Sequence, residues 1–133
     1  MRLTTTLLCD HAQIREGLLF VHSGGITRMR RPAVPCPLSL HLALVARIDA
    51  VELDRQHVVR VTVRHVETLE KVMEAEATFQ TNPAQRKPGE PIFLPLALAL
   101  TGQLNHWGEY DVALGPDGEA GETLSFWVEQ NQP

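Results

Sequence analysis

The sequence predicts an all-β fold, a two-sheet antiparallel β-sandwich with an immunoglobulin-like or related Greek-key order and about seven to nine strands. Apolar residues recur at every second position in several short runs, which is the pattern of strands with one buried face. The nine prolines and nine glycines fall mostly between these runs, where turns are expected. Helical patterns do not alternate with the runs, so a parallel α/β fold is disfavoured.

Length and composition indicate one globular domain. A chain of 133 residues is large enough for its own core, and we expect residues 1–133 to form a single β-sandwich domain. Hydrophobic residues make up 44% and charged residues 21%, values typical of globular proteins. The formal charge of -4 argues against a nucleic-acid partner, because such binding depends on clustered Lys and Arg.

The sequence also bears on the compartment. The apolar part of residues 1–8 is too short for a secretory signal, and no run reaches the roughly 20 residues that span a bilayer. We therefore expect a soluble, cytoplasmic protein with no membrane partner. Cys9 and Cys36 could pair, but a reducing compartment favours free thiols.

The expected strands are the runs with the clearest alternation. In run 38–48 the even-numbered residues, mostly leucines, share one face. In run 92–100 both faces are apolar, and a second copy of the chain is the simplest cover for the face opposite the leucines. Pro95 in that run suits an edge strand or a bulge. The expected strands are 38–48, 57–65, 74–79, 92–100, 110–114 and 124–128, with 27–31 as a further candidate.

Residues 65–77 fit two structures. Val66, Leu69, Met73 and Ala77 form a helical stripe. A hairpin with its turn near residues 67–71 would instead place Arg64 opposite Glu74 and the valines of 57–65 over Ala75, Ala77 and Phe79. We favour the hairpin.

The opening stretch "LLCDHAQIREGLLFVHSGG" places a cysteine, an aspartate and a histidine side by side. Cys9 continues the odd-numbered set of Leu3, Thr5 and Leu7, which predicts burial as a small apolar residue. Asp10 is expected to cap a short helical turn over residues 10–15, and Gly24 with Gly25 to form a bulge. His22 shares parity with Leu18 and Phe20, and we expect it to be buried.

Two segments resemble known patterns. The start, "TLLCDHAQIREGLLFVHSGGITRM", resembles a family of small uncharacterised bacterial proteins of unknown function. The end, "GEYDVALGPDG" with "LSFWVEQ", is similar to the closing hairpin of immunoglobulin-like sandwiches. The resemblance implies a β-sandwich and supplies no activity.

No coherent catalytic or metal-binding set is apparent, so we expect no enzyme activity, no metal and no cofactor. Zinc sites usually take two ligands from a tight pair such as C-x-x-C, and the histidines stand singly. Gly24 and Gly25 lack the rest of a phosphate-loop motif.

Binding through protein contacts is therefore the leading hypothesis, with a homo-oligomer or another protein as partner. The alternative is a small-molecule or carbohydrate-binding module that uses exposed tryptophan and an arginine-rich loop. Trp127 has the parity of a surface residue, opposite Phe126 and Val128. The candidate interface or ligand residues are Trp127, Trp107, Tyr110, Arg28, Arg30, Arg31 and His22.

Overall fold

The computed structural model describes residues 1–81 and 87–132, and in this part of the chain the regular elements are strands plus one short 3-10 turn. The all-β prediction is confirmed. Among the described residues no helix is long and apolar enough to cross a membrane. The elements are β1 (Arg2–Arg15), β2 (Leu18–Gly24), β3 (Arg28–Arg31), β4 (Cys36–Ile48), η1 (Ala50–Glu52), β5 (His57–His65), β6 (Lys71–Phe79), β7 (Ile92–Leu104), β8 (Gly108–Pro116) and β9 (Thr123–Gln130).

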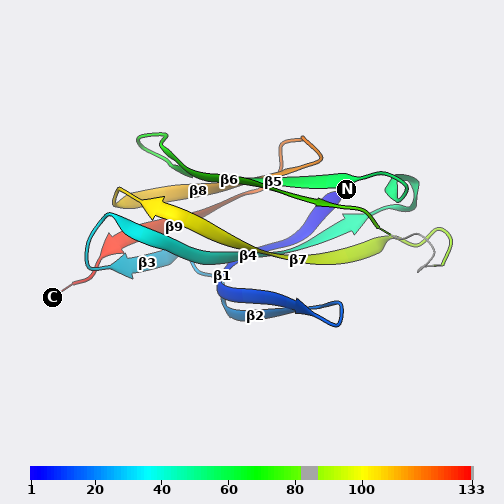
Figure 1. Cartoon of the computed structure of the whole chain (residues 1–133), viewed down its shortest axis with the longest axis horizontal. Coiled ribbons are helices and arrows are strands. Elements are labelled where there is room, and N and C mark those ends of the chain that lie inside the picture. The colour runs from blue at the N-terminus through cyan, green and yellow to red at the C-terminus, as the bar shows by residue number, and fades with distance from the viewer. Residues whose placement is uncertain (82–86, 133) are drawn as a thin grey trace.

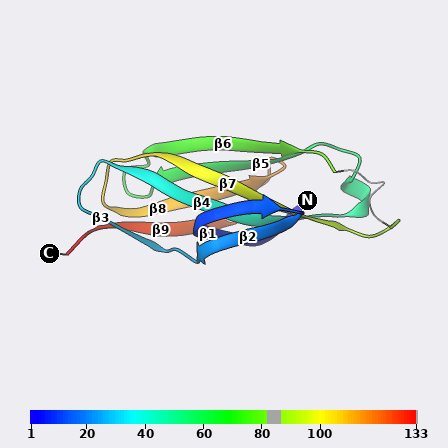
Figure 2. The same cartoon turned by 60° about the horizontal axis from the view of Figure 1, so that its bottom comes forward.

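The strands form two stacked sheets (Figures 1 and 2). One sheet has the order β2-β1-β4-β7 and the other the order β3-β9-β8-β5-β6. The chain thus places β4 and β7 in one sheet and β5, β8 and β9 in the other, as an immunoglobulin-type sandwich places strands B and E opposite C, F and G. All pairs are antiparallel except β3 with β9.

The core lies between the two sheets and follows the predicted alternation. Even-numbered residues of β4, including the fully buried Leu42 and Leu44, face the valines of β5 and the apolar residues of β8 and β9. Burying one such side chain contributes roughly 1.5–3 kcal/mol. The predicted inner face of β4 is therefore confirmed.

Tyr110 strengthens the immunoglobulin-like assignment. Its hydroxyl donates to the carbonyl of His106 at 2.8 Å and accepts from the amide of the same residue at 3.1 Å. A tyrosine near the start of this strand that bonds back to the preceding corner is the tyrosine corner of such sandwiches. The ring is fully buried and stacks on Phe126, with centroids 5.3 Å apart.

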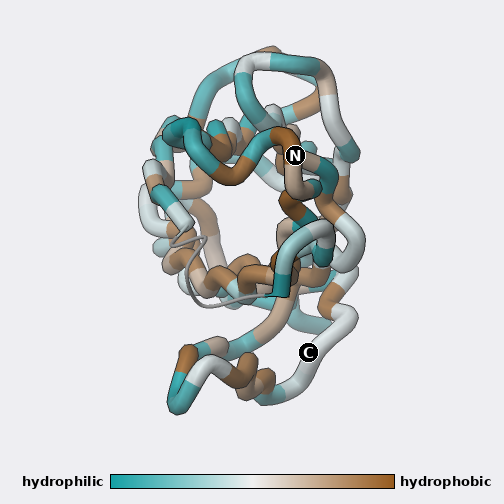
Figure 3. The backbone as a smooth tube through the Cα atoms, turned by 90° about the vertical axis from the view of Figure 1, so that its right-hand side faces the viewer, coloured by the Kyte–Doolittle hydropathy of each residue, from teal (hydrophilic) through white to brown (hydrophobic). Residues whose placement is uncertain are grey.

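The second half of β1 no longer pairs with β4 and forms a hairpin with β2. Cys9 is the last residue that pairs with β4, through His41, and it also pairs with Gly24 of β2. Beyond it the hairpin packs Ala12 and Leu19 against Ala43 and Ala97, on the outer face of β4 and β7. In the end-on view of Figure 3 this hairpin forms a lobe below the ring of the sandwich. The chain itself therefore covers part of the face for which we expected a second copy, while Phe93 stays 56% exposed.

The predicted helical turn over residues 10–15 is wrong, because these residues are strand. His11 to Arg15 pair in register with Leu18 to His22, and the chain reverses at Glu16 and Gly17. Both turn residues have positive φ, 52° and 73°, as in the type I′ turn that suits a two-residue hairpin. Asp10 accordingly lies within β1 and does not cap a helix.

Cys9 is buried as predicted, but it does not lie on the same side of the sheet as Leu3. An irregularity between Leu3 and Thr5 shifts the register, so Leu3 packs into the core while Cys9 packs under the hairpin. Burial there raises the pKa of the Cys9 thiol, which makes it a poor nucleophile at neutral pH. Both cysteines are buried free thiols.

Residues 65–77 belong to the hairpin of β5 and β6 rather than to a helix. The register differs from the predicted one by two residues at Arg60, which pairs with Glu76, and by three at Arg64, which pairs with Lys71. A bulge between Val63 and Arg64 and a turn closed by the His65 amide on the Glu70 carbonyl set this register. The shift keeps the same faces and gives Arg60 an ion pair with Glu76 at 2.5 Å.

The turn between β1 and β2 provides a stability test. Glu16→Asn should raise the free energy of unfolding by up to about 1 kcal/mol, because asparagine tolerates positive φ better than glutamate. Gly17→Ala should lower it by about 1 kcal/mol through backbone strain alone, since nothing lies within 4 Å of an added Cβ. Urea unfolding measures both, and changes of the same sign would contradict the type I′ turn.

Candidate functional site

The β1–β2 hairpin carries the largest group of exposed apolar side chains among the described residues. Leu18 is 61% exposed, Phe20 43%, Ile14 40% and Val21 36%. Leu18 and Phe20 lie on the face turned away from Ala12 and Leu19, the residues that pack on the sheet. Ile14 and Val21 lie on the other face, together with their partners Leu19 and Ala12. We call the two apolar residues exposed on the solvent face, Leu18 and Phe20, the hairpin surface.

His22 is exposed, contrary to expectation. Its shared parity with Leu18 and Phe20 is correct, but that face of the hairpin points to solvent because the other face covers the sheet. His22 lies directly opposite His11, with ring centroids 6.1 Å apart. The His11 ring is also 4.7 Å from that of His41 on β4.

The fold thus gathers three histidines that are scattered in the sequence. His41 Nδ1 lies 3.3 Å from the Asp10 carbonyl oxygen, and among the described residues no ion pair joins a carboxylate to these three rings. Imidazole suits zinc, copper and nickel. Within residues 1–81 and 87–132, however, no group of three or more His, Cys, Asp or Glu side chains is arranged to hold a metal ion.

Trp127 and the arginines lie together at one edge of the five-stranded sheet. Trp127 is 42% exposed, and Arg28 is its partner on the parallel strand β3. Arg28 forms an ion pair with Glu129, and Arg30 Nε lies 4.0 Å from the same carboxylate. Arg31 donates to the Arg30 carbonyl at 2.8 Å. The carboxylate offsets part of the local positive charge.

Trp107 and Tyr110 do not join Trp127 in one aromatic platform. Tyr110 is fully buried, and Trp107 is half-buried against the core. The Tyr110 ring contacts the rings of Phe126 and His65. Of the three aromatic residues singled out from the sequence, only Trp127 is available as an exposed binding residue.

A shallow groove crosses the outer face of β5 and β8. It consists of two adjoining cavities of about 370 and 350 Å³, which share Thr62, Ala113 and Thr123. Arg60 lines the first cavity, and Arg64 and Asp111 line the second. Volumes of this size are at the lower end of those that hold small ligands.

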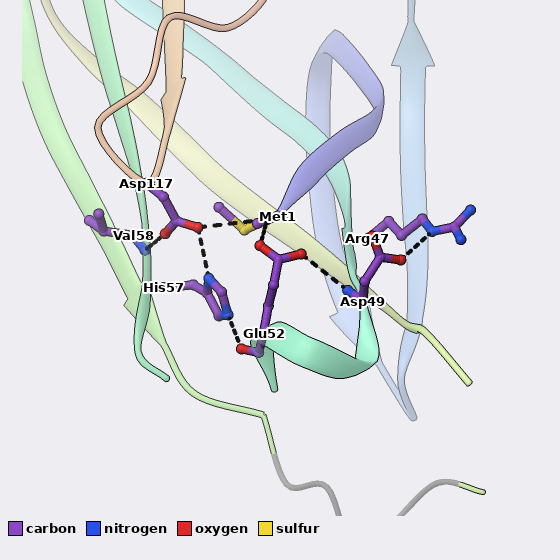
Figure 4. A network of polar contacts seen from close by, with 7 residues as sticks. All are labelled: Met1, Arg47, Asp49, Glu52, His57, Val58 and Asp117. Atoms are coloured by element: carbon purple, nitrogen blue, oxygen red, sulfur yellow. Dashed lines mark hydrogen bonds and ion pairs between the residues drawn. The ribbon is translucent and has the colours of Figure 1, made fainter. Parts of the chain in front are cut away.

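A polar network surrounds the buried His57 at the end of the sandwich (Figure 4). His57 Nδ1 lies 2.8 Å from Asp117 Oδ2, and Nε2 lies 2.8 Å from the Glu52 carbonyl oxygen. Both partners are acceptors, so the ring donates to both only as an imidazolium. The amino group of Met1 forms an ion pair with the Glu52 carboxylate and lies 3.9 Å from Asp117 Oδ2.

The electrostatics of Asp117 fit this network. Burial alone would raise the pKa of Asp117, but the hydrogen bonds from His57 and from the Val58 amide hold it below its usual value. A catalytic histidine needs a ring nitrogen that faces substrate or nucleophile. Both nitrogens of His57 are already engaged inside the protein. From the start of β5 the ring links Glu52 of η1 to Asp117 of the turn after β8.

His65 is engaged in the same way at the other end of β5. Its Nδ1 accepts from the Thr68 amide at 3.2 Å and from the Thr68 hydroxyl at 2.8 Å. Its Nε2 donates to the Trp107 carbonyl at 3.0 Å. These partners fix the neutral tautomer with the proton on Nε2. His65 therefore has no nitrogen left for a substrate.

A family model with the description "family of unknown function (DUF6941)" matches residues 4–129. The chain belongs to this family. The match spans the hairpin, both sheets and the closing hairpin, and the resemblance inferred from the opening stretch is confirmed as one to an uncharacterised family. Among curated proteins none matches the sequence.

For this DUF6941 member, the sequence pattern predicts the exposure of Trp127 but not two of the arrangements that the structure shows. The hairpin surface is not predicted, because the pattern of residues 10–15 favours a helical turn. The His57–Asp117 pair was missed because its members are 60 positions apart in sequence. The sequence does contain one signal for this pair. His57 is in phase with Val59 and Val61, which indicates a histidine on the buried face of the strand.

The His57 network predicts acid-sensitive stability. The pKa of Asp117 is lower in the folded protein than the unfolded value of about 3.9, so its stabilisation is present at neutral pH. It is lost as the pH falls through the folded-state pKa. Asp117→Asn should lower the free energy of unfolding at pH 7 by about 2 kcal/mol and flatten its decline in acid. Urea unfolding at a series of pH values measures both effects.

Asp111→Asn is the matched control, because Asp111 accepts one hydrogen bond from Ser125 on the outer face and contacts no buried histidine. It should change stability by less than about 1 kcal/mol. Equal losses for the two variants would contradict a special role for the His57 network.

Proposed function

We propose that the protein is a non-enzymatic, cytoplasmic β-sandwich that acts through protein–protein contacts and associates with further copies of itself. Neither a nucleic acid nor a membrane is part of the proposal, and the net charge of -4 agrees with that choice. The observation that carries the proposal is the hairpin surface.

The hairpin surface supports a protein partner because its exposed residues are close together and large. Leu18 and Phe20 are two positions apart on the solvent face of β2, so their exposed side chains are neighbours on that face. Isolated exposed apolar residues are common on protein surfaces, but a contiguous group usually marks a contact site. Covering Leu18 and Phe20 would also bury more apolar area than covering Trp127 alone.

The buried histidines support the non-enzymatic part. His57 and His65 are the buried histidines among the described residues, and each uses both ring nitrogens for internal bonds. The thiol of Cys9 has a raised pKa. These three side chains are thus committed to internal packing and hydrogen bonds rather than to acid–base or nucleophilic chemistry.

Replacing the hairpin surface should weaken self-association. Leu18→Ser combined with Phe20→Ser removes apolar area worth about 2 kcal/mol at an interface, so the dissociation constant should rise about 30-fold. Sedimentation velocity over a range of protein concentrations measures it. The control is Val51→Ser, which removes an apolar side chain that is 80% exposed in η1, outside the hairpin. A strictly monomeric natural protein would reject the proposal.

A small-molecule or carbohydrate-binding module is the second candidate, favoured by the groove over β5 and β8 with Trp127 and Arg28 at the sheet edge. A thermal-shift screen of sugars and small anions should then contain a compound that raises the melting temperature, because binding to the folded state stabilises it. Ala113→Phe, which fills the part shared by both cavities, should abolish the shift. Val51→Phe is the control, and a shift that survives Ala113→Phe would exclude the groove.

A further inference from the structure

We infer that the partner in self-association is a second copy whose β2 pairs antiparallel with the free edge of β2, with Phe20 on the twofold axis. This inference rests on the proposed function and specifies its interface. The result would be one continuous sheet through both molecules, joined by a self-complementary contact.

The backbone of β2 has groups free to pair. The two-residue turn makes Arg15 and Leu18 the first hydrogen-bonded pair, and such pairs alternate along an antiparallel ladder. Leu18, Phe20 and His22 therefore bond to β1, whereas the amides and carbonyls of Leu19 and Val21 point outward. In Figures 1 and 2 β2 lies at the margin of the molecule with no strand beyond it.

The other three sheet edges of the described residues are less suited to self-pairing. β3 has four residues, three of which are arginines, and β6 carries Lys71, Glu74 and Glu76. Charged side chains on an edge oppose pairing with another strand. β7 contains Pro95, and β6 approaches it so closely that a Cβ on Gly102 would lie 2.8 Å from Val72.

β2 differs because it carries no Lys, Arg, Asp or Glu between Leu18 and Gly24. In a twofold antiparallel pairing, each side chain of β2 faces either the same residue or a nearby residue of an identical β2 strand. A charged strand would place like charges together, which destabilises a sheet. An uncharged strand avoids this cost, and that favours a second copy over a charged foreign strand as the occupant.

The register follows from the regular part of β2. Ser23 has a φ of 54°, so regular strand geometry ends before it. If Leu19 of one copy pairs with Val21 of the other, the outward-pointing amides and carbonyls of both residues all form hydrogen bonds between the two copies. Phe20 then faces Phe20 of the second copy in a pair without hydrogen bonds, where side chains approach most closely, at a Cα separation of about 4.5 Å. Leu18 lies opposite His22.

This arrangement covers the exposed apolar side chains. The two Phe20 rings, each 43% exposed in the single chain, would shield each other. Leu19 and Val21 would continue the apolar layer that Ala12 and Leu19 form over the sheet. Both faces of the new strand pair would therefore be apolar near the twofold axis.

Opposite charges at position 20 test the inference. Phe20→Lys and Phe20→Glu should each be monomeric at concentrations where the natural protein is a dimer, because like charges meet on the axis. An equimolar mixture of the two variants should regain the dimer as a heterodimer, with at least a 10-fold lower dissociation constant than either variant alone. Sedimentation velocity with one variant fluorescently labelled measures the exchange. Phe20 lies on the solvent side of the hairpin, so both variants should fold, which circular dichroism checks.

Val51→Lys and Val51→Glu are the matched control pair, and they should dimerise like the natural protein both alone and mixed. A natural protein that is monomeric throughout would overturn the proposed function itself. If the natural protein dimerises and Leu18→Ser with Phe20→Ser dissociates it, but the mixed Lys and Glu variants do not recover, the proposed function stands and Phe20 is not on the axis. Dimers of Phe20→Lys as tight as the natural ones would overturn the inference in the same way.

Discussion

Leu42, Ala43 and Leu44 of β4 are consecutive and fully buried, although successive side chains of a strand point to opposite faces. Both faces of β4 are therefore covered. The five-stranded sheet covers the leucine side, and the β1–β2 hairpin covers Ala43. Much of the architecture depends on this double burial, because the hairpin can pack closely only where the outer face offers alanines, at positions 43 and 97, and where Cys9 ends the pairing of β1 with β4.

Covering that face has a consequence for the surface. The hairpin buries Ala12 and Leu19, and alternation then turns Leu18, Phe20 and His22 to solvent. The same strand β2 is an edge of its sheet and carries no Lys, Arg, Asp or Glu. The apolar group that distinguishes this molecule from a bare sandwich is thus a direct result of how its outer face is covered. Structural role and proposed binding role belong to the two faces of the same seven-residue strand.

The polar residues inside the molecule have a different task. β5 lies between β8 and β6, and a buried histidine lies at each of its ends. His57 bonds to Asp117 and to the Glu52 carbonyl, and His65 bonds to Thr68 and to the Trp107 carbonyl. Each ring therefore joins one end of β5 to a neighbouring turn or loop through its side chain. A buried polar group is costly unless it is fully bonded, so both networks also specify the loop conformations around them.

The alternation of apolar residues was enough to predict the strands, the inner face of β4 and the exposure of Trp127, because these depend on the two-residue period alone. It could not predict the face on which Cys9 lies, since a register irregularity near Thr5 reverses the parity inherited from Leu3. Nor could it show that His22 is exposed, because that depends on the hairpin covering β4 from outside. His11, His22 and His41 meet for the same reason. For the histidines the alternation along each strand was correct, and what the sequence did not show was that the β1–β2 hairpin lies over the outer face of the sheet. Such layering is set by contacts between residues about 30 positions apart, such as Ala12 with Ala43, which a single sequence does not display.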